Sequence, residues 1–324
     1  MVIKKVCVLG CGGFVGSHLA SKLYEHGYSV RVPYRNINHA KHLSVLPAVS
    51  LVEADVHDPE TLVKLFQGMD AVINLVGILH EHKPGAFQRA HVDLPRKVVE
   101  ACRATGVKRL LHMSALGGDP DGLSRYQRSK GEGEALVLAA HGEDLAVTVF
   151  RPSVIFGPED SFLNLFARLL QWAPIFPLGS PYAKFQPVYV GDVAHAYAAS
   201  LNNPATFGQR YELCGPTVYT LRELVEFVAR VKGLKRVVIP LSDEMSSLQA
   251  RLLGLMPVKM LTHDNYLTLK TDAVCGCPFP EVFGIQPAAL EAEAPQYLAA
   301  TALPRHRSSR SLSTSRSIRS LSDS

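Results

Sequence analysis

The 324-residue sequence has no long hydrophobic run, because no stretch reaches the roughly 18 apolar residues that a membrane-spanning helix needs. Residues 1–9 place Lys4 and Lys5 before an apolar segment, as a signal peptide does. That segment is too short and ends in a glycine run. The sequence therefore predicts neither a transmembrane span nor a cleaved leader.

Strong charge of one sign is also lacking, except in the last residues. The net charge is +5, and residues 305–324 contribute +4 through five Arg and one Asp, which leaves +1 for the other 304 residues. A folded body this close to neutral argues against a nucleic-acid-binding surface. The Ser- and Arg-rich tail, residues 304–324, has almost nothing apolar to bury and is predicted to be disordered.

The six cysteines lack the spacing of a metal site. Cys275 and Cys277 form the only close pair, with neither a second pair nor a histidine nearby, so no metal site is predicted. Cys7 and Cys102 fall on apolar faces and are expected to be small core residues. This usage suits a reducing compartment and favours a cytoplasmic protein.

A glycine run lies where a predicted strand turns directly into a predicted helix. Residues 3–9 are apolar and β-branched, as in a buried parallel strand, and residues 14–26 repeat apolar positions every four residues. The free N–H groups and the dipole at such a helix N-terminus favour a pyrophosphate. We therefore predict a dinucleotide site here, while a ligand-free tight turn is the plainer alternative. Its residues are Gly10, Gly13, Phe14, Val15 and Gly16.

No acidic residue follows the second predicted strand, residues 28–33. An acid at that position bonds the ribose hydroxyls of NAD, whereas an Arg accepts the extra phosphate of NADP. Here Arg35 stands there, and its guanidinium can pair bidentately with a phosphate. We expect NADP(H) to be preferred, with NAD(H) as the alternative cofactor.

Two further strand ends are predicted to contact the cofactor. Asp55 and Val56 follow a third strand, where the Asp55 carboxylate could accept a hydrogen bond from the adenine amine. Val76 and Gly77 end a fourth strand, where the backbone could approach the ribose. Both positions lie at carboxyl ends of strands, where ligands bind in open α/β sheets.

Strands and helices alternate as far as a fifth strand, residues 106–113. A helix over residues 84–104 precedes it, and Pro95 should kink that helix or mark a local break. This alternation predicts an α/β fold with a doubly wound parallel sheet.

A serine, a tyrosine and a lysine are spaced for proton transfer. Ser114 follows the fifth strand, and Tyr126 and Lys130 share one face of a helix because they are four residues apart. The Lys130 ammonium is expected to lower the pKa of Tyr126 from about 10. Ser114 would hold a substrate oxygen, and Tyr126 would exchange its proton as hydride moves. An exposed tyrosine beside a solvated lysine is the plainer alternative.

These residues resemble the short-chain dehydrogenase/reductase superfamily in its extended or atypical branch. The likeness rests on the glycine spacing, on Asp55-Val56, on Ser114, Tyr126 and Lys130, and on residues 151–158. It implies a Rossmann fold, with Pro152 and Val154 beside the nicotinamide and with Tyr126 and Lys130 also in contact with the cofactor.

A narrower likeness is to the family of the dehydrogenase-like accessory subunit of respiratory complex I and its bacterial relatives. It covers roughly residues 3–300 and rests on residues 91–95, 112–116 and 124–126. That family implies NADPH binding and a largely structural role. His91 stands where many catalytic relatives carry an Asn in a proton relay, and it could still bond a water.

The family likeness and the residues leave three functions open. The first is hydride transfer to an apolar substrate, quinone-like or acyl. The second is a non-catalytic nucleotide-binding module that assembles with a respiratory or membrane partner. The third is a nucleotide-sugar epimerase or dehydratase, which would need a more polar substrate side.

The second half of the chain is predicted to form a smaller α/β substrate lobe. The nucleotide domain spans residues 1–158 and is completed by about 187–214, whereas residues 159–186 and 215–303 form a lid or substrate lobe. The apolar helix 161–172 suggests an apolar ligand, although ordinary core packing explains it equally well. A Leu- and Met-rich helix over 246–261 and the basic tail leave peripheral contact with the inner face of a bacterial membrane open.

Overall fold

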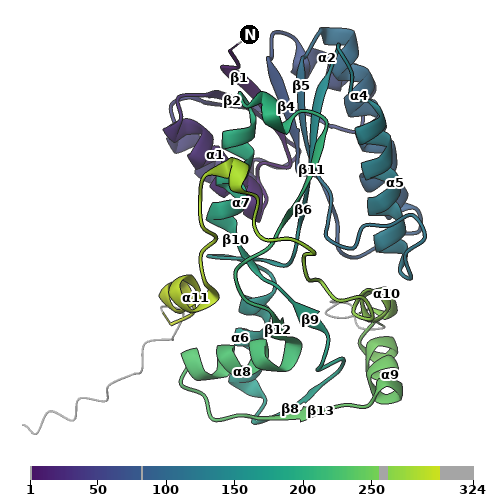
Figure 1. Cartoon of the computed structure of the whole chain (residues 1–324), viewed down its shortest axis with the longest axis vertical. Coiled ribbons are helices and arrows are strands. Elements are labelled where there is room, and N and C mark those ends of the chain that lie inside the picture. Colours follow the sequence, from purple (N-terminus) through teal and green to yellow (C-terminus); the bar gives the residue numbers. More distant parts are fainter. Residues whose placement is uncertain (1, 82, 255–261, 300–324) are drawn as a thin grey trace, which may run out of the picture.

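The computed structural model describes residues 2–81, 83–254 and 262–299 (Figure 1). Its centre is a seven-stranded sheet in the order β11-β6-β5-β4-β1-β2-β3, and each neighbouring pair is parallel. The predicted doubly wound parallel sheet is thereby confirmed. Its strands are β1 (Lys5–Leu9), β2 (Ser29–Tyr34), β3 (Val49–Glu53), β4 (Ala71–Asn74), β5 (Arg109–Met113), β6 (Ala146–Pro152) and β11 (Gln209–Leu213).

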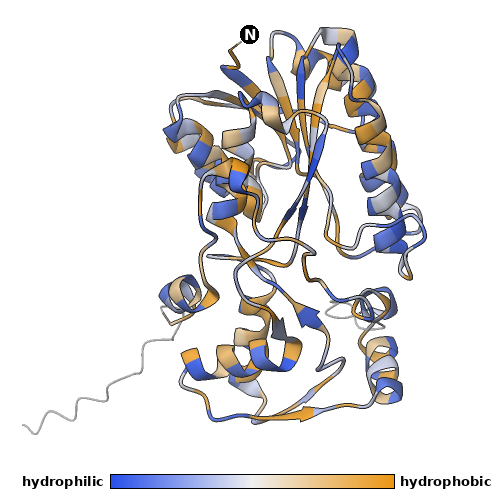
Figure 2. Cartoon of the chain, viewed as in Figure 1, coloured by the Kyte–Doolittle hydropathy of each residue, from blue (hydrophilic) through white to orange (hydrophobic). Residues whose placement is uncertain are grey.

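Helices cover both faces of this sheet (Figure 1). In β1, Val6 and Val8 enter one core whereas Cys7 and Leu9 enter the other, because successive side chains point to opposite faces. Figure 2 shows the resulting apolar strands between half-polar helices. The first core lies under α1 (Phe14–Glu25) and α7 (Val190–Ser200), and the second lies under α2 (Pro59–Phe66), α4 (Leu94–Thr105) and α5 (Arg125–Ala139).

The helix predicted over residues 84–104 is broken into three parts. A short α3 (Ala86–Gln88) runs into a π-helical turn at Arg89–Asp93 before α4 begins. Pro95 lies in the first turn of α4, where its missing N–H has no helical partner to lose. The expected local break is confirmed, and it takes the form of a wide turn that carries His91.

Most of the remaining chain forms a smaller lobe at the carboxyl end of the sheet, whereas residues 279–285 return to pack on the first core (Figure 1). The lobe core includes Leu163, Ala167 and Leu170 of α6, so packing explains the apolar character of that helix. Thr220 opens α8 with a capping box. The helices here are α6 (Leu163–Trp172), α8 (Leu221–Val231), α9 (Asp243–Gly254), α10 (His263–Thr268) and α11 (Leu290–Leu298).

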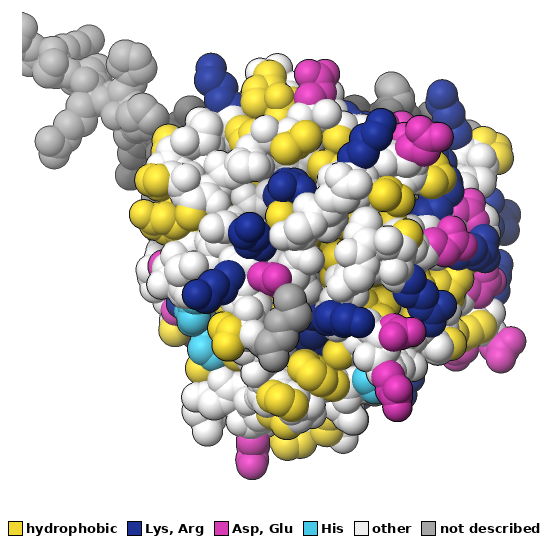
Figure 3. Space-filling model, turned by 90° about the horizontal axis from the view of Figure 1, so that it is seen from above, with side chains coloured by type: hydrophobic (Ala, Val, Ile, Leu, Met, Phe, Trp, Pro, Cys, Tyr) yellow, Lys and Arg dark blue, Asp and Glu magenta, His cyan; other side chains and the backbone are white. Residues whose placement is uncertain are grey.

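Short strand pairs and single turns complete the described chain. The pairs are β7 (Ile155–Phe156) with β10 (Val188–Tyr189), β9 (Lys184–Phe185) with β12 (Tyr219–Thr220), and β8 (Ile175–Leu178) with β13 (Val237–Pro240). The turns are η1 (Ile37–His39), η2 (Lys41–Val45), η4 (Pro204–Thr206) and η5 (Glu281–Phe283). No described helix has the length and apolarity that crossing a membrane requires. On the face drawn in Figure 3, Lys and Arg are interspersed with Asp and Glu.

Two predictions reach past the described residues. The helix expected over 246–261 corresponds to α9, which is described as far as Gly254, and residues 255–261 lie outside the described part. The tail predicted to be disordered, 304–324, also lies outside it.

The cysteines differ in part from the prediction. Cys7 and Cys102 are fully buried core residues, as expected. Cys214 and Cys275, however, form a disulfide across 61 residues of sequence, so the expectation of a fully reduced chain is wrong for this pair. Two cysteines so far apart have no spacing signal, and only the fold brings them together.

Candidate active site

The glycine turn after β1 has the geometry that its spacing predicts. Gly10 has φ +80°, in the left-handed region that favours glycine, and the Gly13 N–H donates to the Gly10 carbonyl at 3.1 Å. A Cβ on Gly16 would lie 2.4 Å from Cys11 Cα, so a larger residue would push α1 away from the turn. Among the described residues no side chain caps α1 at Gly13, and its first turn holds no acid. Its first N–H groups are therefore available to an anion.

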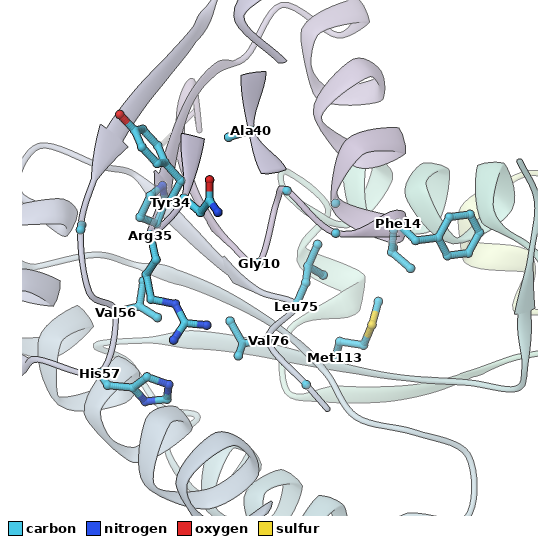
Figure 4. Close-up of a pocket in the computed structure, with 18 residues that line it drawn as sticks. Gly10, Phe14, Tyr34, Arg35, Ala40, Val56, His57, Leu75, Val76 and Met113 are labelled. Carbon is cyan, nitrogen blue, oxygen red and sulfur yellow. The ribbon is translucent and has the colours of Figure 1, made fainter. Parts of the chain in front are cut away.

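A cavity of about 750 Å³ lies in front of this turn, along the carboxyl ends of β1, β2 and β4 (Figure 4). Predicted cofactor residues make up half of its lining: Gly10, Gly13, Phe14, Val15, Gly16, Arg35, Val56, Val76 and Gly77. The other half was not predicted, although most of these residues adjoin a predicted one at the same strand end. They are Gly12, Pro33, Tyr34, Asn36, Ala40, Ala54, His57, Leu75 and Met113.

The end of the cavity near β2 is cationic. Figure 4 shows the Arg35 guanidinium reaching into the cavity on the side where His57 lies. Burial lowers the pKa of His57, and the charges of Arg89, Arg35 and Lys97 lower it further, while Asp55 opposes them. Lys97 also donates to the His57 carbonyl at 2.8 Å. Several cations therefore converge where an adenosine phosphate would need them.

Five of the predicted cofactor residues do not line this cavity: Asp55, Tyr126, Lys130, Pro152 and Val154. The Asp55 carboxylate accepts the His57 N–H at 3.0 Å, which ties it to its own loop. The Pro152 carbonyl accepts the Leu116 N–H at 2.9 Å, and the Val154 carbonyl accepts the Val188 N–H at 3.0 Å. The contact of all five residues with a cofactor stays a prediction.

Ser114 and Lys130 come together at the carboxyl end of β5, and Tyr126 lies one turn before Lys130 on α5. A Cβ on Gly118 would lie 3.2 Å from Ser114 Oγ and 3.4 Å from Lys130 Cβ, so both side chains border the same small space. Ser114 is 3% exposed, and its hydroxyl has no hydrogen-bond partner in the described structure. Lys130 Nζ donates to the carbonyl of Met113, which lines the cavity, at 2.7 Å. An unpaired buried hydroxyl is costly, and it fits a site that a ligand completes.

The protonation of Tyr126 differs from the prediction. Its ring packs edge-on against the stacked rings of Phe87 and His91, with ring centroids at 5.9 and 5.6 Å. Burial raises the pKa of Tyr126 to about 12 instead of lowering it. Burial also lowers the pKa of Lys130 to about 8. The predicted lowering of the Tyr126 pKa by the Lys130 ammonium does not appear, and loss of solvation disfavours the phenolate.

His91 is held on both ring nitrogens. Nε2 accepts the Ile78 N–H at 3.1 Å, which places the proton on Nδ1, and Nδ1 donates to Ser129 Oγ at 2.9 Å. Ser129 Oγ in turn donates to the Tyr126 carbonyl at 3.0 Å. Burial, together with the charge of Lys130, lowers the pKa of His91 to about 3. The expectation that His91 bonds a water is therefore wrong for this arrangement, and His91 acts as a neutral link.

A residue missed by sequence reasoning fixes the helix that carries Tyr126. The Asp264 carboxylate in α10 accepts the backbone N–H groups of Arg125 at 2.8 Å and of Tyr126 at 3.1 Å. Thr268 Oγ1 also donates to Ser124 Oγ, the N-cap of α5, at 2.8 Å. Contacts across 138 residues have no local signal, so sequence spacing could not have found Asp264.

Comparisons with known proteins place the chain among dinucleotide-binding proteins. The profile of the family described as "NAD dependent epimerase/dehydratase family" matches residues 6–214. The chain is 32% identical over 317 residues to NADH dehydrogenase [ubiquinone] 1 alpha subcomplex subunit 9 of Mus musculus, which covers 95% of this chain and 81% of the mouse protein.

A bacterial reductase is also similar. The chain is 30% identical over 239 residues to a protein of Caulobacter vibrioides named ceramide reductase, and the match covers 74% of each chain. Among solved structures, Pal from Bacillus thuringiensis superposes with a TM-score of 0.72 at 15% identity, over 91% of this chain and 99% of that one. The last likeness shows the fold alone. Together with the glycine turn and the cavity, these matches show that the chain belongs to the NAD-dependent epimerase/dehydratase family.

Proposed function

We propose that the protein binds NADP(H) in the cavity at Gly10 and reduces a carbonyl of an apolar substrate, acyl or quinone-like. The observation that carries this proposal is the pairing of a cationic nucleotide cavity with an unpartnered, buried Ser114 hydroxyl beside it. The cationic cavity favours a nucleotide with an extra phosphate group. The unpaired Ser114 hydroxyl leaves a hydrogen-bond donor for a substrate oxygen.

The residues of the cavity suit two groups of the cofactor, its pyrophosphate and its 2′-phosphate. The N–H groups at the start of α1 would hold the pyrophosphate, and the close packing of the turn leaves no room for a side chain at Gly16. Arg35, supported by the field of Arg89 and Lys97, would take the 2′-phosphate that distinguishes NADP from NAD. An acid would repel that phosphate, and the β2 end has none.

The side chains near Met113 suit reduction better than oxidation. Bound NADPH would supply the hydride. Ser114 Oγ would donate a hydrogen bond to the substrate carbonyl oxygen and orient it. Tyr126 is protonated at neutral pH because its pKa is about 12, so it is prepared to give a proton to the developing alkoxide. Removing a proton from an alcohol would instead require the phenolate, which burial disfavours.

The proposal of an apolar substrate rests on similarity to a known reductase and not on the apolar residues of the smaller lobe. The Caulobacter relative is named ceramide reductase, and its name implies a substrate with an acyl chain. The apolar residues of α6 add nothing to this argument because they are buried in the lobe core. A substrate of this class would bring the protein to the inner face of a bacterial membrane as a peripheral protein.

A second candidate is a non-catalytic nucleotide-binding subunit of a respiratory complex. His91 favours it, because both ring nitrogens are already bonded and none is left for a proton relay. The similarity to the mouse subunit over 95% of the chain favours it as well. In this case the nucleotide would serve as a structural ligand.

Nucleotide release and titration test both candidates. The purified protein is denatured to identify any released nucleotide, and the stripped protein is titrated with NADPH and NADH. Exchangeable NADPH that is consumed with long-chain ketones, ceramide precursors or quinones, and not by Tyr126→Phe, supports the reductase. Tightly held NADPH that none of them oxidises supports the structural subunit. Failure to bind either nucleotide contradicts both proposals.

A further inference from the structure

Three of the six cysteines lie together, away from the candidate active site. Cys214 follows β11 directly and is bonded to Cys275. Cys277, two residues further on, is a free and exposed thiol. The remaining cysteines, Cys7, Cys11 and Cys102, are buried, and burial raises the pKa of each thiol well above its ordinary value. Reactive sulfur chemistry is therefore concentrated in one place.

The disulfide fastens a segment that crosses between the lobes, residues 272–277, here called the strap. The Ala273 N–H donates to the Lys184 carbonyl at 2.8 Å, and the Ala273 carbonyl accepts from Ser153 Oγ at 2.8 Å. The Cys275 N–H donates to Gln186 Oε1 at 3.0 Å, and the Gly276 N–H donates to Glu212 Oε2 at 3.2 Å. Within the described part of the chain, Cys275 and Gly276 each have one hydrogen bond besides the disulfide.

The two bonded sulfurs differ in access. Cys214 is 1% exposed, whereas Cys275 is partly exposed. Gly215 holds Cys214 in a tight corner, since a Cβ on Gly215 would lie 2.0 Å from the Pro187 carbonyl oxygen. Solvent therefore reaches Cys275 more readily than the buried Cys214. Thiol–disulfide exchange requires access to the attacked sulfur, so attack at Cys275 with Cys214 leaving is the open route.

We propose that Cys214, Cys275 and Cys277 form a thiol–disulfide exchange site whose substrate is a low-molecular-weight thiol such as glutathione. The thiolate attacks Cys275 Sγ, a mixed disulfide with Cys275 forms, and the Cys214–Cys275 bond breaks. Cys214 leaves as a thiolate and takes a proton from water. The Cys277 thiolate then attacks Cys275 Sγ, the Cys275–Cys277 bond forms, and the small thiolate leaves unchanged.

This sequence consumes no electrons, because one protein disulfide and one protein thiol are present before and after it. Its effect is to release the strap from β11. A second molecule of the small thiol, attacking the mixed disulfide in place of Cys277, would yield the oxidised small disulfide and three protein thiols. Both routes end with Cys214 free and the strap without its covalent bond to the residue after β11.

Release of the strap would affect the cofactor-binding side of the protein through Ser153. This residue donates to the Ala273 carbonyl and lies between Pro152 and Val154, which are predicted to flank the nicotinamide. Loosening the strap is therefore expected to weaken NADPH binding severalfold. This consequence rests on the proposed function, whereas the exchange chemistry does not.

Disulfide mapping tests the exchange. The full-length protein is incubated in buffers of increasing reduced-to-oxidised glutathione ratio, quenched with acid, alkylated and mapped by mass spectrometry. The expected result is loss of Cys214–Cys275 with gain of Cys275–Cys277, while Cys7, Cys11 and Cys102 stay unmodified. In Cys277→Ser the glutathione adduct on Cys275 should accumulate at least tenfold, and in the control Cys102→Ala it should not.

Three outcomes overturn the proposal. One is a Cys214–Cys275 bond that survives until the chain unfolds. Another is a chain whose six cysteines all stay free in oxidised glutathione. The third is an adduct on Cys275 that is equally abundant in wild type and Cys277→Ser. NADPH titration of the same samples separates the two claims, since a disulfide that moves in a protein that never binds NADPH contradicts only the proposed function.

Discussion

The two ends of the candidate active site are built on opposite principles. The nucleotide end is an open cavity of about 750 Å³, shaped by glycines and lined on one side by a cation, Arg35. The proposed catalytic end is closed, and Ser114, Lys130 and His91 are each at most 5% exposed. The comparison shows that a sequence motif predicts where an ionisable side chain lies, at the end of a strand. The burial of that side chain decides its protonation state. Four measurements can break or sharpen this contrast.

The largest effect is expected at the closed end, from Tyr126→Phe. Removing the phenol removes the proposed proton donor, and such donors contribute about 10³-fold, or roughly 4 kcal/mol of transition-state stabilisation. NADPH affinity should change less than twofold, because Tyr126 does not line the nucleotide cavity. The measurement is steady-state reduction beside NADPH titration, with the exposed Tyr24→Phe as the control. A loss of activity below tenfold would remove Tyr126 from the chemistry.

The next effect is a loss of stability in acid that originates at His91. Its pKa is about 3 in the folded chain and about 6.5 when unfolded, so the folded state is favoured above pH 6.5 and loses that advantage as the pH falls toward 3. From pH 7 to 4.5 the free energy of unfolding should fall by about 3 kcal/mol through this residue alone.

Urea unfolding at several pH values measures this loss. His91→Asn should reduce the slope, and the slope that remains reflects other groups such as His112, whose pKa burial also lowers; the exposed His26→Asn is the control. Equal slopes in wild type and His91→Asn would show that His91 is not held neutral. In that case the closed end would not keep His91 uncharged, and the contrast with the open end would fail at this residue.

At the open end, Arg35→Asp should weaken NADPH by about 50-fold, or roughly 2 kcal/mol, because a repulsive charge replaces an attractive one. NADH should lose less than threefold, since it lacks the 2′-phosphate. Fluorescence titration measures both affinities. The exposed Lys64→Asp makes the same charge change on α2, away from the cavity, and serves as the control. Equal losses for the two nucleotides would place Arg35 away from the 2′-phosphate.

The smallest effect compares two helix caps. Ser124 caps α5 with a capping box and Thr220 caps α8 in the same way. Replacing either by Ala should lower the free energy of unfolding by about 1 kcal/mol. Only Ser124→Ala should also lower kcat, by severalfold, because α5 carries Tyr126. If both variants lowered kcat equally, the position of α5 would have no special bearing on the chemistry.

The location of the site was predictable because its signals are local. The Gly10, Gly13 and Gly16 spacing and the four-residue step from Tyr126 to Lys130 each refer to one turn or one helix. Alternation of strands and helices likewise predicted the parallel sheet, and the break near Pro95 followed from one residue.

What the sequence did not predict depends on contacts between distant segments. The raised pKa of Tyr126 comes from burial in a site where Phe87 and His91, nearly forty residues earlier in the chain, pack on its ring. Asp264 reaches α5 across 138 residues, and Cys214 meets Cys275 across 61. Such pairs carry no periodicity or spacing, so only the folded chain reveals them.

The Cys214–Cys275 bond also changes the connectivity of the protein. It closes a covalent ring that takes in α8, β13, α9 and α10, so the ends of this stretch are joined whatever happens between them. A protease that cuts once inside the ring leaves a single molecule of unchanged mass apart from one added water. The two fragments separate on a denaturing gel only when the sample is reduced.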